Sequence, residues 1–300
     1  NWRFKLFYWD YVIGVLLFSL FSALTLGSFG HGGRSFIADL KQADSDNIIK
    51  ALIGGIIFNA ANILLSAAIS IAGMAVAFPV GIGIALILGV VINYINAPQG
   101  NLEFILIGIV LITAAIIVNA IAYKKVSKSE KKLSFKGLLI AVLAGLLMSL
   151  FYRFIASSMD LSNFEQPAVG KMTPYTAVFI FSIGILLSNF IFNSILIYKP
   201  FEGAPTNYSA WFKGKFSIHL TGILGGVIWG IGNSFNLIAA GKAGPAISYG
   251  LGQGATMVAA LWGVFIWKEF KQKGTNTGGL IAAMFVLFIA GLGMLIYSGM

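Results

Sequence analysis

The stretch GGIIFNAANILLSAAISIAG, residues 54–73, is long enough and apolar enough to cross a membrane as one helix. A helix needs about 20 apolar residues to span the hydrocarbon of a bilayer. Two asparagines, Asn59 and Asn62, interrupt the run, and lipid offers an amide no hydrogen-bond partner. Because polar side chains at membrane depth face protein or a water-filled space, this segment is predicted to lie against other helices.

The rest of the chain has the composition of a polytopic membrane protein. Of its 300 residues 58% are hydrophobic and 10% are charged, whereas soluble domains are about 25% charged. The apolar runs are continuous rather than alternating, which favours helices over a barrel. The predicted fold class is therefore an all-α polytopic membrane protein. Nine spans are expected, at residues 11–27, 48–71, 74–95, 102–123, 135–157, 173–198, 216–240, 244–267 and 277–298.

A second copy of the opening stretch lies 171 positions further along the chain. GGVIWGIGNSFN, residues 225–236, has its first two glycines and Asn233 where the first copy has Gly54, Gly55 and Asn62. Ten positions are identical between residues 54–94 and 225–265, whereas chance would give about four in a chain of this composition. Spans one to four therefore repeat as spans six to nine.

The fifth span has no counterpart within the chain, since its partner would precede residue 1. We therefore expect ten helices in a 5+5 inverted repeat, with nine of them seen and an N-terminal helix missing; a nine-helix protein is the alternative. Inverted repeats with an odd number of helices are common in secondary transporters. The predicted organisation is one transmembrane domain, residues 1–300. It comprises a truncated first repeat (1–123), a basic linker (124–134) and a second repeat (135–300).

The net charge of +10 is interpreted as a topology signal rather than as a nucleic-acid surface. Alternate loops carry fourteen Lys and Arg residues on one side and six on the other. By the positive-inside rule the first side is cytoplasmic, including KKVSKSEKK at residues 124–132, and the C-terminus is outside. Membrane lipid is thus an expected partner, and nucleic acid is not.

No pattern of residues typical of an enzyme is present. His31 and His219 lack metal-ligand spacing around them, and the chain has no cysteine. The run GLGQG, residues 250–254, lies inside a span without a preceding strand or a following Lys-Ser/Thr, so it does not fit a phosphate loop. We expect no catalysis, no cofactor and no metal.

The polar residues inside the spans are the candidates for binding. Asn62 and Asn233 occupy equivalent repeat positions, and steps of three or four residues place further polar groups on the same helix faces. Sites in repeat-built transporters lie near the midplane. The alternative is that each amide merely joins two helices. The predicted substrate-binding residues are Asn59, Asn62, Asn189, Trp229, Asn233, Asn236, Tyr249 and Gln253.

Chain breakers and ionisable groups complete the predicted machinery. Gly73 and Gly244 separate consecutive spans with almost no loop, and Pro79 and Gly250 occupy equivalent positions just afterwards. With Gly254, these five are the predicted hinge and packing residues; Gly226 with Gly230 and Gly250 with Gly254 are small-xxx-small pairs. None of the ten acidic residues lies mid-span. Asp10 and His219, near span ends, are the candidates for coupling to a proton or a sodium ion.

Two stretches resemble the ureide permeases of the drug/metabolite transporter superfamily. FNAANILLSAAISIAGMAVAFPVGIGIALILGVVINYI, residues 58–95, is followed by a hydrophilic turn and another span, as in that family. NWRFKLFYWDYVIG, residues 1–14, is similar to the join between the first two helices of bacterial members. Glucose/ribose porters and the rhamnose–proton symporter are relatives with a ten-helix plan. The resemblance implies uptake of a sugar or ureide-like nitrogen compound, with protons as a coupling ion, across a bacterial inner or plasma membrane.

Three functional hypotheses follow. The first is a permease that moves a small neutral polar solute by alternating access. The second is a metabolite or drug exporter of the same superfamily. The third belongs to a different class, a membrane scaffold or sensor that transports nothing, and cysteine labelling of the polar faces would separate it from the others.

Overall fold

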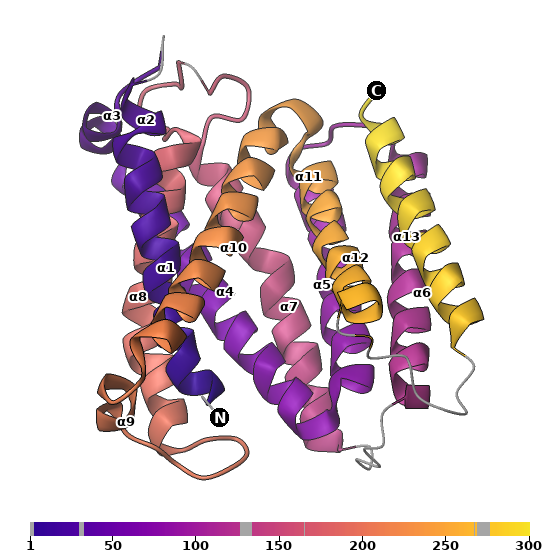
Figure 1. The fold of residues 1–300 in the computed structure, drawn as a ribbon. Helices are drawn as coiled ribbons and strands as arrows, with labels where there is room; N and C mark the ends of the chain where they lie inside the picture. The colour runs from indigo at the N-terminus through magenta and orange to yellow at the C-terminus, as the bar shows by residue number, and fades with distance from the viewer. Residues whose placement is uncertain (1–2, 30–32, 127–133, 165, 267, 269–276) are drawn as a thin grey trace. The chain divides into compact units, whose positions relative to one another are not determined.

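The computed structural model describes residues 3–29, 33–126, 134–164, 166–266, 268 and 277–300. Nine segments in these ranges are long and apolar enough to cross a membrane, which confirms the nine predicted spans. Part of the predicted linker, residues 127–133, and His31 lie outside the described residues. The helices are α1 (Phe4–Leu24), α2 (Leu26–Phe29), α3 (Phe36–Gln42), α4 (Ser45–Ala72), α5 (Met74–Asn96), α6 (Leu102–Val126), α7 (Phe135–Ser158), α8 (Pro174–Tyr198), α9 (Tyr208–Phe212), α10 (Phe216–Ala243), α11 (Pro245–Gly252), α12 (Gly254–Leu261) and α13 (Gly278–Ser298), with a π-helical turn at Trp262–Ile266 (Figure 1).

Helix boundaries recur at the spacing of the sequence repeat. Helices α4 and α10 are both 28 residues long, and each begins and ends 171 positions from the other. A single glycine follows each, Gly73 with φ 82° and ψ 158° and Gly244 with φ 85° and ψ 152°. Glycine has no Cβ and enters this positive-φ region without a steric penalty. The connections with almost no loop that were expected at these glycines are therefore confirmed.

The chain divides into two compact units, and each takes segments from both halves of the sequence. Unit 1 comprises Asn1–Ile63 and Leu150–Lys242, and unit 2 comprises Leu64–Ser149 and Ala243–Met300. The boundaries fall inside α4 and α7 and at the junction of α10 with α11. Each unit is described by itself below.

In unit 1, helix α1 packs closely against α10 through glycines. A Cβ placed on Gly14 would lie 2.1 Å from the carbonyl oxygen of Ile223, and one on Gly226 would lie 2.0 Å from that of Tyr11. One turn further, a Cβ on Gly230 would approach the ring of Phe18. The small-xxx-small pair Gly226 and Gly230 therefore forms the predicted close helix contact, and its partner is α1.

The same crossing is built a second time between α4 and α8 of unit 1. A Cβ on Gly55 would lie 2.1 Å from the Phe181 carbonyl oxygen, and one on Gly184 would lie 2.3 Å from that of Leu52. Gly55 is the repeat equivalent of Gly226, and Gly184 that of Gly14. Glycine permits this backbone approach because it has no side chain. The agreement is consistent with the predicted repeat.

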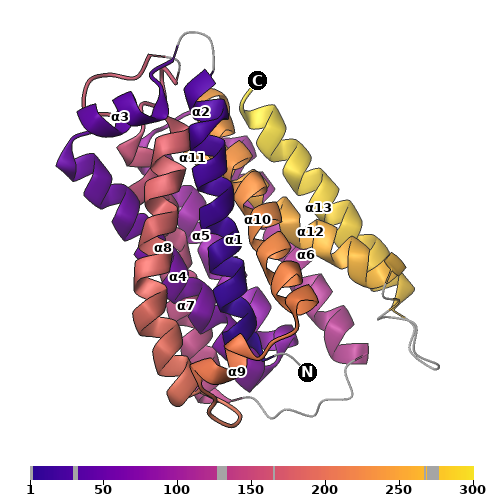
Figure 2. The ribbon, with the colours of Figure 1, turned by 60° about the vertical axis from the view of Figure 1, so that its left-hand side comes forward.

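Unit 2 is built around α5, α6, α11 and α13, with the early part of α7 and the end of α4 beside them (Figures 1 and 2). Helices α6 and α13 lie side by side, where a Cβ on Gly108 or on Gly291 would come within 3.0 Å of the other glycine's carbonyl oxygen. Small residues also form the core beside α4 and α7, where Ala68 and Ala141 are fully buried. Close packing of small residues is the usual means of helix association in a membrane.

The eighth span is discontinuous. Helix α11 ends at Gly252, Gln253 stands in a turn, and α12 begins at Gly254. Gly250 itself is packed, since a Cβ there would lie 2.8 Å from Leu295 Cδ1, and a Cβ on Gly254 would meet α13 only at ordinary contact distance. The equivalent helix α5 is continuous with Pro79 inside it. The interruption therefore belongs to one copy of the repeat, and it falls at Gln253.

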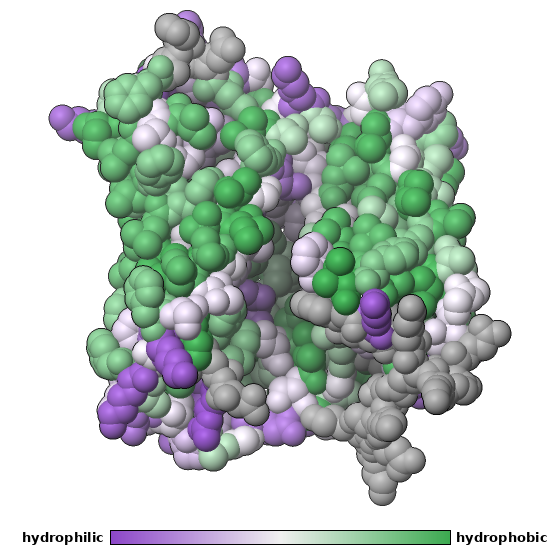
Figure 3. All heavy atoms as spheres, viewed as in Figure 1, coloured by the Kyte–Doolittle hydropathy of each residue, from purple (hydrophilic) through white to green (hydrophobic). Residues whose placement is uncertain are grey.

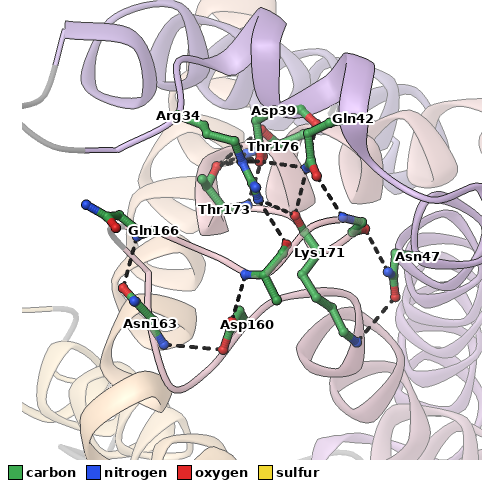
Figure 4. A network of polar contacts seen from close by, with 12 residues as sticks. Arg34, Asp39, Gln42, Asn47, Asp160, Asn163, Gln166, Lys171, Thr173 and Thr176 are labelled. Atoms are coloured by element: carbon green, nitrogen blue, oxygen red, sulfur yellow. Dashed lines mark hydrogen bonds and ion pairs between the residues drawn. The ribbon is translucent and has the colours of Figure 1, made fainter.

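The end of unit 1 that carries α2 and α3 is held by a polar network (Figure 4). The fully buried Asp39 carboxylate accepts hydrogen bonds from the Thr173 backbone N–H at 2.8 Å and from Arg34 Nε at 3.0 Å. Arg34 Nη2 and Gln42 Nε2 donate to the Lys171 carbonyl at 2.7 and 2.9 Å. Buried polar groups satisfied in this way hold the loop between α7 and α8 against α3.

The loop after α7 has its own internal hydrogen bonds, and Figure 4 draws those that join Asp160, Asn163 and Gln166. The Asp160 carboxylate accepts from the Ser162 hydroxyl and from the Ala168 backbone N–H. These contacts, led by the Ser162 bond, lower the pKa of Asp160 below its ordinary value. The loop is therefore a folded cap of unit 1 at neutral pH.

Surface chemistry agrees with the span assignment. In Figure 3 hydrophobic residues cover the middle of the helices of each unit, and hydrophilic residues gather toward the helix ends. Exposed large apolar side chains continue along single helices, for example Ile228 and Phe235 on α10, at 68% and 67% exposed. Extended apolar surface of this kind is typical of protein that contacts lipid.

Candidate functional site

The Asn59 amide joins three helices of unit 1. It is fully buried, and its Oδ1 accepts a 2.9 Å hydrogen bond from Tyr8 Oη on α1. Its Nδ2 donates to Ser188 Oγ at 2.9 Å and to the Ile185 carbonyl at 3.3 Å, both on α8. Asn59 thus makes the contacts of a helix staple, and its role in substrate binding stays a prediction.

Tyr8 links Asn59 to the next predicted residue, Asn62. Asn62 lies one turn further along α4, and its Nδ2 donates to the same Tyr8 Oη at 3.2 Å. The sequence reasoning missed Tyr8. A signal was present, because a tyrosine inside a span needs a partner for its hydroxyl, and Tyr8 precedes the candidate Asp10 by two residues. The Tyr8 hydroxyl therefore connects the amides of Asn59 and Asn62 on α4.

Two further predicted residues carry buried polar atoms without a hydrogen-bond partner among the described residues. Asn189 on α8 is fully buried, and neither its Nδ2 nor its Oδ1 is paired. Asn233 on α10, the repeat equivalent of Asn62, has an unpaired Nδ2. Leaving such a group unsatisfied costs about 1–3 kcal/mol. These two amides, like Trp9 Nε1, Asp10 Oδ2 and Asn193 Oδ1 of the same unit, keep hydrogen-bonding capacity that the described residues do not use.

Trp229 lies in an aromatic cluster of unit 1. Its ring stacks on Phe58 with centroids 4.6 Å apart and planes 30° apart, and it also contacts Tyr11 at 6.1 Å and Phe181 at 6.3 Å. Phe58 is the immediate neighbour of Asn59, and Asn233 follows Trp229 by one turn of α10. An aromatic face beside amides is suited to a planar or ring-shaped polar solute.

The remaining predicted binding residues, Asn236, Tyr249 and Gln253, are divided between the two units. The backbone carbonyl of Asn236 accepts a 3.3 Å hydrogen bond from Tyr152 Oη in unit 1. Tyr249 and Gln253 belong to unit 2. The buried Tyr249 hydroxyl lies 3.1 Å from the carbonyls of both Ala85 and Met148. Six of the eight predicted residues thus share unit 1, whereas Tyr249 stabilises unit 2 and Gln253 marks its helix break.

The two coupling candidates are brought together in unit 1 although they are 209 positions apart. Asp10 on α1 is 1% exposed, and its Oδ1 lies 2.7 Å from His219 Nδ1 on α10. Trp211 of the short helix α9 donates its indole N–H to the same oxygen at 2.9 Å. A Cβ on Gly222 would come within 2.4 Å of Asp10 Cβ, so this glycine permits the approach. Asp10 and His219 were predicted from the sequence, whereas Trp211 was not among the predicted site residues.

This cluster joins the two residues predicted to couple transport to an ion, and that role stays a prediction. A carboxylate and an imidazole that share a hydrogen bond are the groups used for proton transfer within membranes. Asp10 Oδ2 is buried and has no partner among the described residues. This buried oxygen is therefore available to accept a hydrogen bond from a further donor.

A separate cavity of about 240 Å³ lies at the α2–α3 end of unit 1. Its lining includes Arg34, Phe164, Tyr175 and Ile238, and it contains none of the predicted binding residues. Arg34 is already engaged by Asp39 and by loop carbonyls. The cavity therefore belongs to the folded cap of unit 1.

Comparison with known families agrees with the architecture. The profile of the Ureide permease family matches residues 7–134 and 110–298 of this chain. Ureide permease 1 of Arabidopsis thaliana is 24% identical, with 97% of this chain and 88% of the relative aligned. Ureide permease 2 of the same plant is 22% identical over the same shares.

A shorter match concerns a bacterial protein. The probable glucose uptake protein GlcU of Staphylococcus aureus (strain N315) is 40% identical over 70 residues, which cover 23% of this chain and 24% of the relative. The family profile matches well over half of the chain. With nine apolar spans in its described part, the chain is an integral multi-pass membrane protein that belongs to the ureide permease family.

Proposed function

We propose that this chain is a secondary permease that moves a small neutral polar solute, a sugar or a ureide-like nitrogen compound, by alternating access. The names of the long-matching relatives and of the glucose uptake protein support this substrate range. The observation that carries the proposal is the buried, unpaired Nδ2 atom of Asn233, one turn of α10 from the Trp229 ring. Amides recognise carbonyl and hydroxyl groups, and an aromatic face packs against a flat ring.

The proposed binding groups are those predicted from the sequence, with roles drawn from their contacts. Asn189 offers both of its unpaired amide atoms, Asn233 offers its unpaired Nδ2, and Trp229 offers its ring, while Asn62 is hydrogen-bonded to Tyr8. The set also includes Asn59, Asn236, Tyr249 and Gln253, which support the binding residues or the helix break. Gly73 and Gly244 are proposed as hinges because each provides a positive-φ turn between two spans.

Coupling to an ion is part of the proposal. A proton carried by the Asp10–His219 pair is favoured by their 2.7 Å contact, and sodium is the alternative. We also propose that the basic loops are cytoplasmic and that the C-terminus is outside, by the positive-inside rule. Maleimide labelling of single cysteines, placed in this naturally cysteine-free chain, tests that orientation.

The first prediction concerns the two equivalent asparagines. Asn233→Ala and Asn62→Ala should each lower initial uptake of the transported solute by about tenfold, the effect of losing one hydrogen bond in a desolvated site. Uptake of radiolabelled allantoin and glucose into proteoliposomes measures the effect and identifies the better substrate. Asn96→Ala, at an exposed position at the end of α5, is the matched control. Unchanged uptake in both variants, with normal folding, would refute their assignment.

The second prediction separates binding from structure at Asn189. Asn189→Leu removes an amide that has no partner among the described groups, so it should raise the stability of the folded protein by about 1–3 kcal/mol. If the amide binds solute, uptake falls in the same variant. Asn59→Leu is the contrast, because it deletes three hydrogen bonds and should destabilise. Thermal melting in detergent and uptake are measured together. A less stable Asn189→Leu, or one with full uptake, contradicts the role.

A further inference from the structure

The loop between α8 and α10, residues 199–215, is folded back onto the first turns of α1. Arg3 Nη1 donates to the carbonyls of Ala204 and Pro205 at 3.0 and 2.9 Å. Lys5 Nζ donates to the Ala204 carbonyl at 2.8 Å. We call residues 199–215, which include α9, the strap. Its middle is thus held by two cationic side chains, Arg3 just before α1 and Lys5 in its first turn.

The helical part of the strap lies against both α1 and α8. Asn207 caps α9 by accepting from the Ala210 N–H. The Tyr208 ring contacts Trp9 edge to face at 5.9 Å, and its hydroxyl hydrogen-bonds Ser194 of α8. A helix of five residues is too short to be stable by itself. Its position therefore depends on these contacts to the spans.

One of these contacts joins the strap to the ionisable pair. The Trp211 indole N–H donates to Asp10 Oδ1 at 2.9 Å, and the Trp211 ring meets the His219 ring edge to face at 4.9 Å. A hydrogen bond to an ionised carboxylate is about twice as strong as one between neutral groups. The hold of Trp211 on α1 therefore weakens when Asp10 becomes protonated.

The charged groups around Asp10 and His219 are accounted for as follows. Arg3, just before α1, and Lys5, in its first turn, donate hydrogen bonds to strap carbonyls. On α10, His219 faces Asp10 directly. Lys213 and Lys215, between α9 and α10, are exposed to solvent. The Asp10 carboxylate is thus the anion to which both the indole and the imidazole are directed, and the protonation of Asp10 changes both contacts together.

We propose that Trp211 is a positioning residue that closes the strap over the start of α1 while Asp10 is ionised and releases it when Asp10 takes up a proton. This inference rests on the proposed coupling role of the Asp10–His219 pair. It assigns a gate to residues 199–215. The gate lies within unit 1. It opens when the charge-assisted hydrogen bond from Trp211 to Asp10 is lost.

The test measures the position of the strap separately from transport. A cysteine replaces the exposed Ser209 of α9 in the full chain reconstituted in liposomes, and the rate of maleimide labelling is compared with a free thiol at each pH. In the parent chain the normalised rate should rise as the pH falls. Trp211→Phe keeps the ring but not the N–H, so its rate should be about tenfold higher at neutral pH and nearly independent of pH.

Trp9→Phe is the matched control. Phenylalanine keeps an aromatic ring for the contact with Tyr208 and removes only Nε1–H, which has no hydrogen-bond partner among the described residues, so this variant should label as the parent does. Asp10→Asn keeps an acceptor oxygen without the charge and should give the pH-independent, faster rate. Equal labelling of the Trp211→Phe and parent chains at every pH would overturn the gate. If labelling behaves as expected but the protein transports no solute, the proposed function is refuted and the proposed gating by the strap is retained.

Discussion

Asp10→Asn abolishes concentrative uptake while it leaves exchange of solute across the membrane nearly unchanged. The substitution keeps the size of the side chain and an oxygen that can accept from Trp211 and His219, but it removes the group that takes up a proton. A potential of about 100 mV is worth about 2.3 kcal/mol per charge. One coupled proton therefore supports about fiftyfold accumulation, and the variant should only equilibrate the solute.

Proteoliposomes with an imposed potential or pH gradient measure this result, and counterflow without a gradient measures exchange. His219→Gln is the companion variant, because it retains a hydrogen-bonding group at the same place while removing the imidazole. Accumulation by Asp10→Asn to the level of the parent chain would exclude Asp10 as the coupling site. Accumulation that follows a sodium gradient rather than a proton gradient would select the alternative ion.

Gly226→Ala lowers the free energy of unfolding more than a glycine-to-alanine substitution at any other position of α10. The new Cβ would lie 2.0 Å from the Tyr11 carbonyl oxygen, a backbone atom that cannot move aside as a flexible side chain can. Helices α1 and α10 must then separate. Overpacking of a close-packed contact costs about 1–3 kcal/mol and more where the backbone must shift, so we expect about 3 kcal/mol or more.

Gly232→Ala on the same helix is the control, because a Cβ there meets no described atom within 4 Å. It should be neutral or slightly stabilising, since alanine favours the helix over glycine. Gly55→Ala tests the repeat, because its Cβ would lie 2.1 Å from the Phe181 carbonyl in the equivalent crossing. Melting in detergent and the yield of monodisperse protein report both effects. Equal stability of Gly226→Ala and Gly232→Ala would contradict the close crossing.

The candidate site was only partly predictable. Asn62 and Asn233 stand out in the sequence because they are amides at equivalent places in two apolar runs. Their different states, with Asn62 bonded to Tyr8 and Asn233 Nδ2 unpaired, depend on which helix each faces. That Asn59 joins α4 to α1 and α8 could not be predicted, for the same reason. A sequence repeat predicts equivalent positions, and it does not predict equivalent partners, because α1 carries Tyr8 where α8 carries Val178.

By itself the sequence determined the nine spans, the repeat and the two glycine turns at Gly73 and Gly244. These features depend on short-range properties, namely the length of an apolar run and the freedom of glycine at positive φ. Only the tertiary structure decided that Asp10, Trp211 and His219 meet, that Tyr8 joins Asn59 to Asn62, and that the chain divides into two units drawn from both halves. Such contacts depend on which helix faces pack together, and packing joins residues between 51 and 209 positions apart, whose proximity no local pattern encodes.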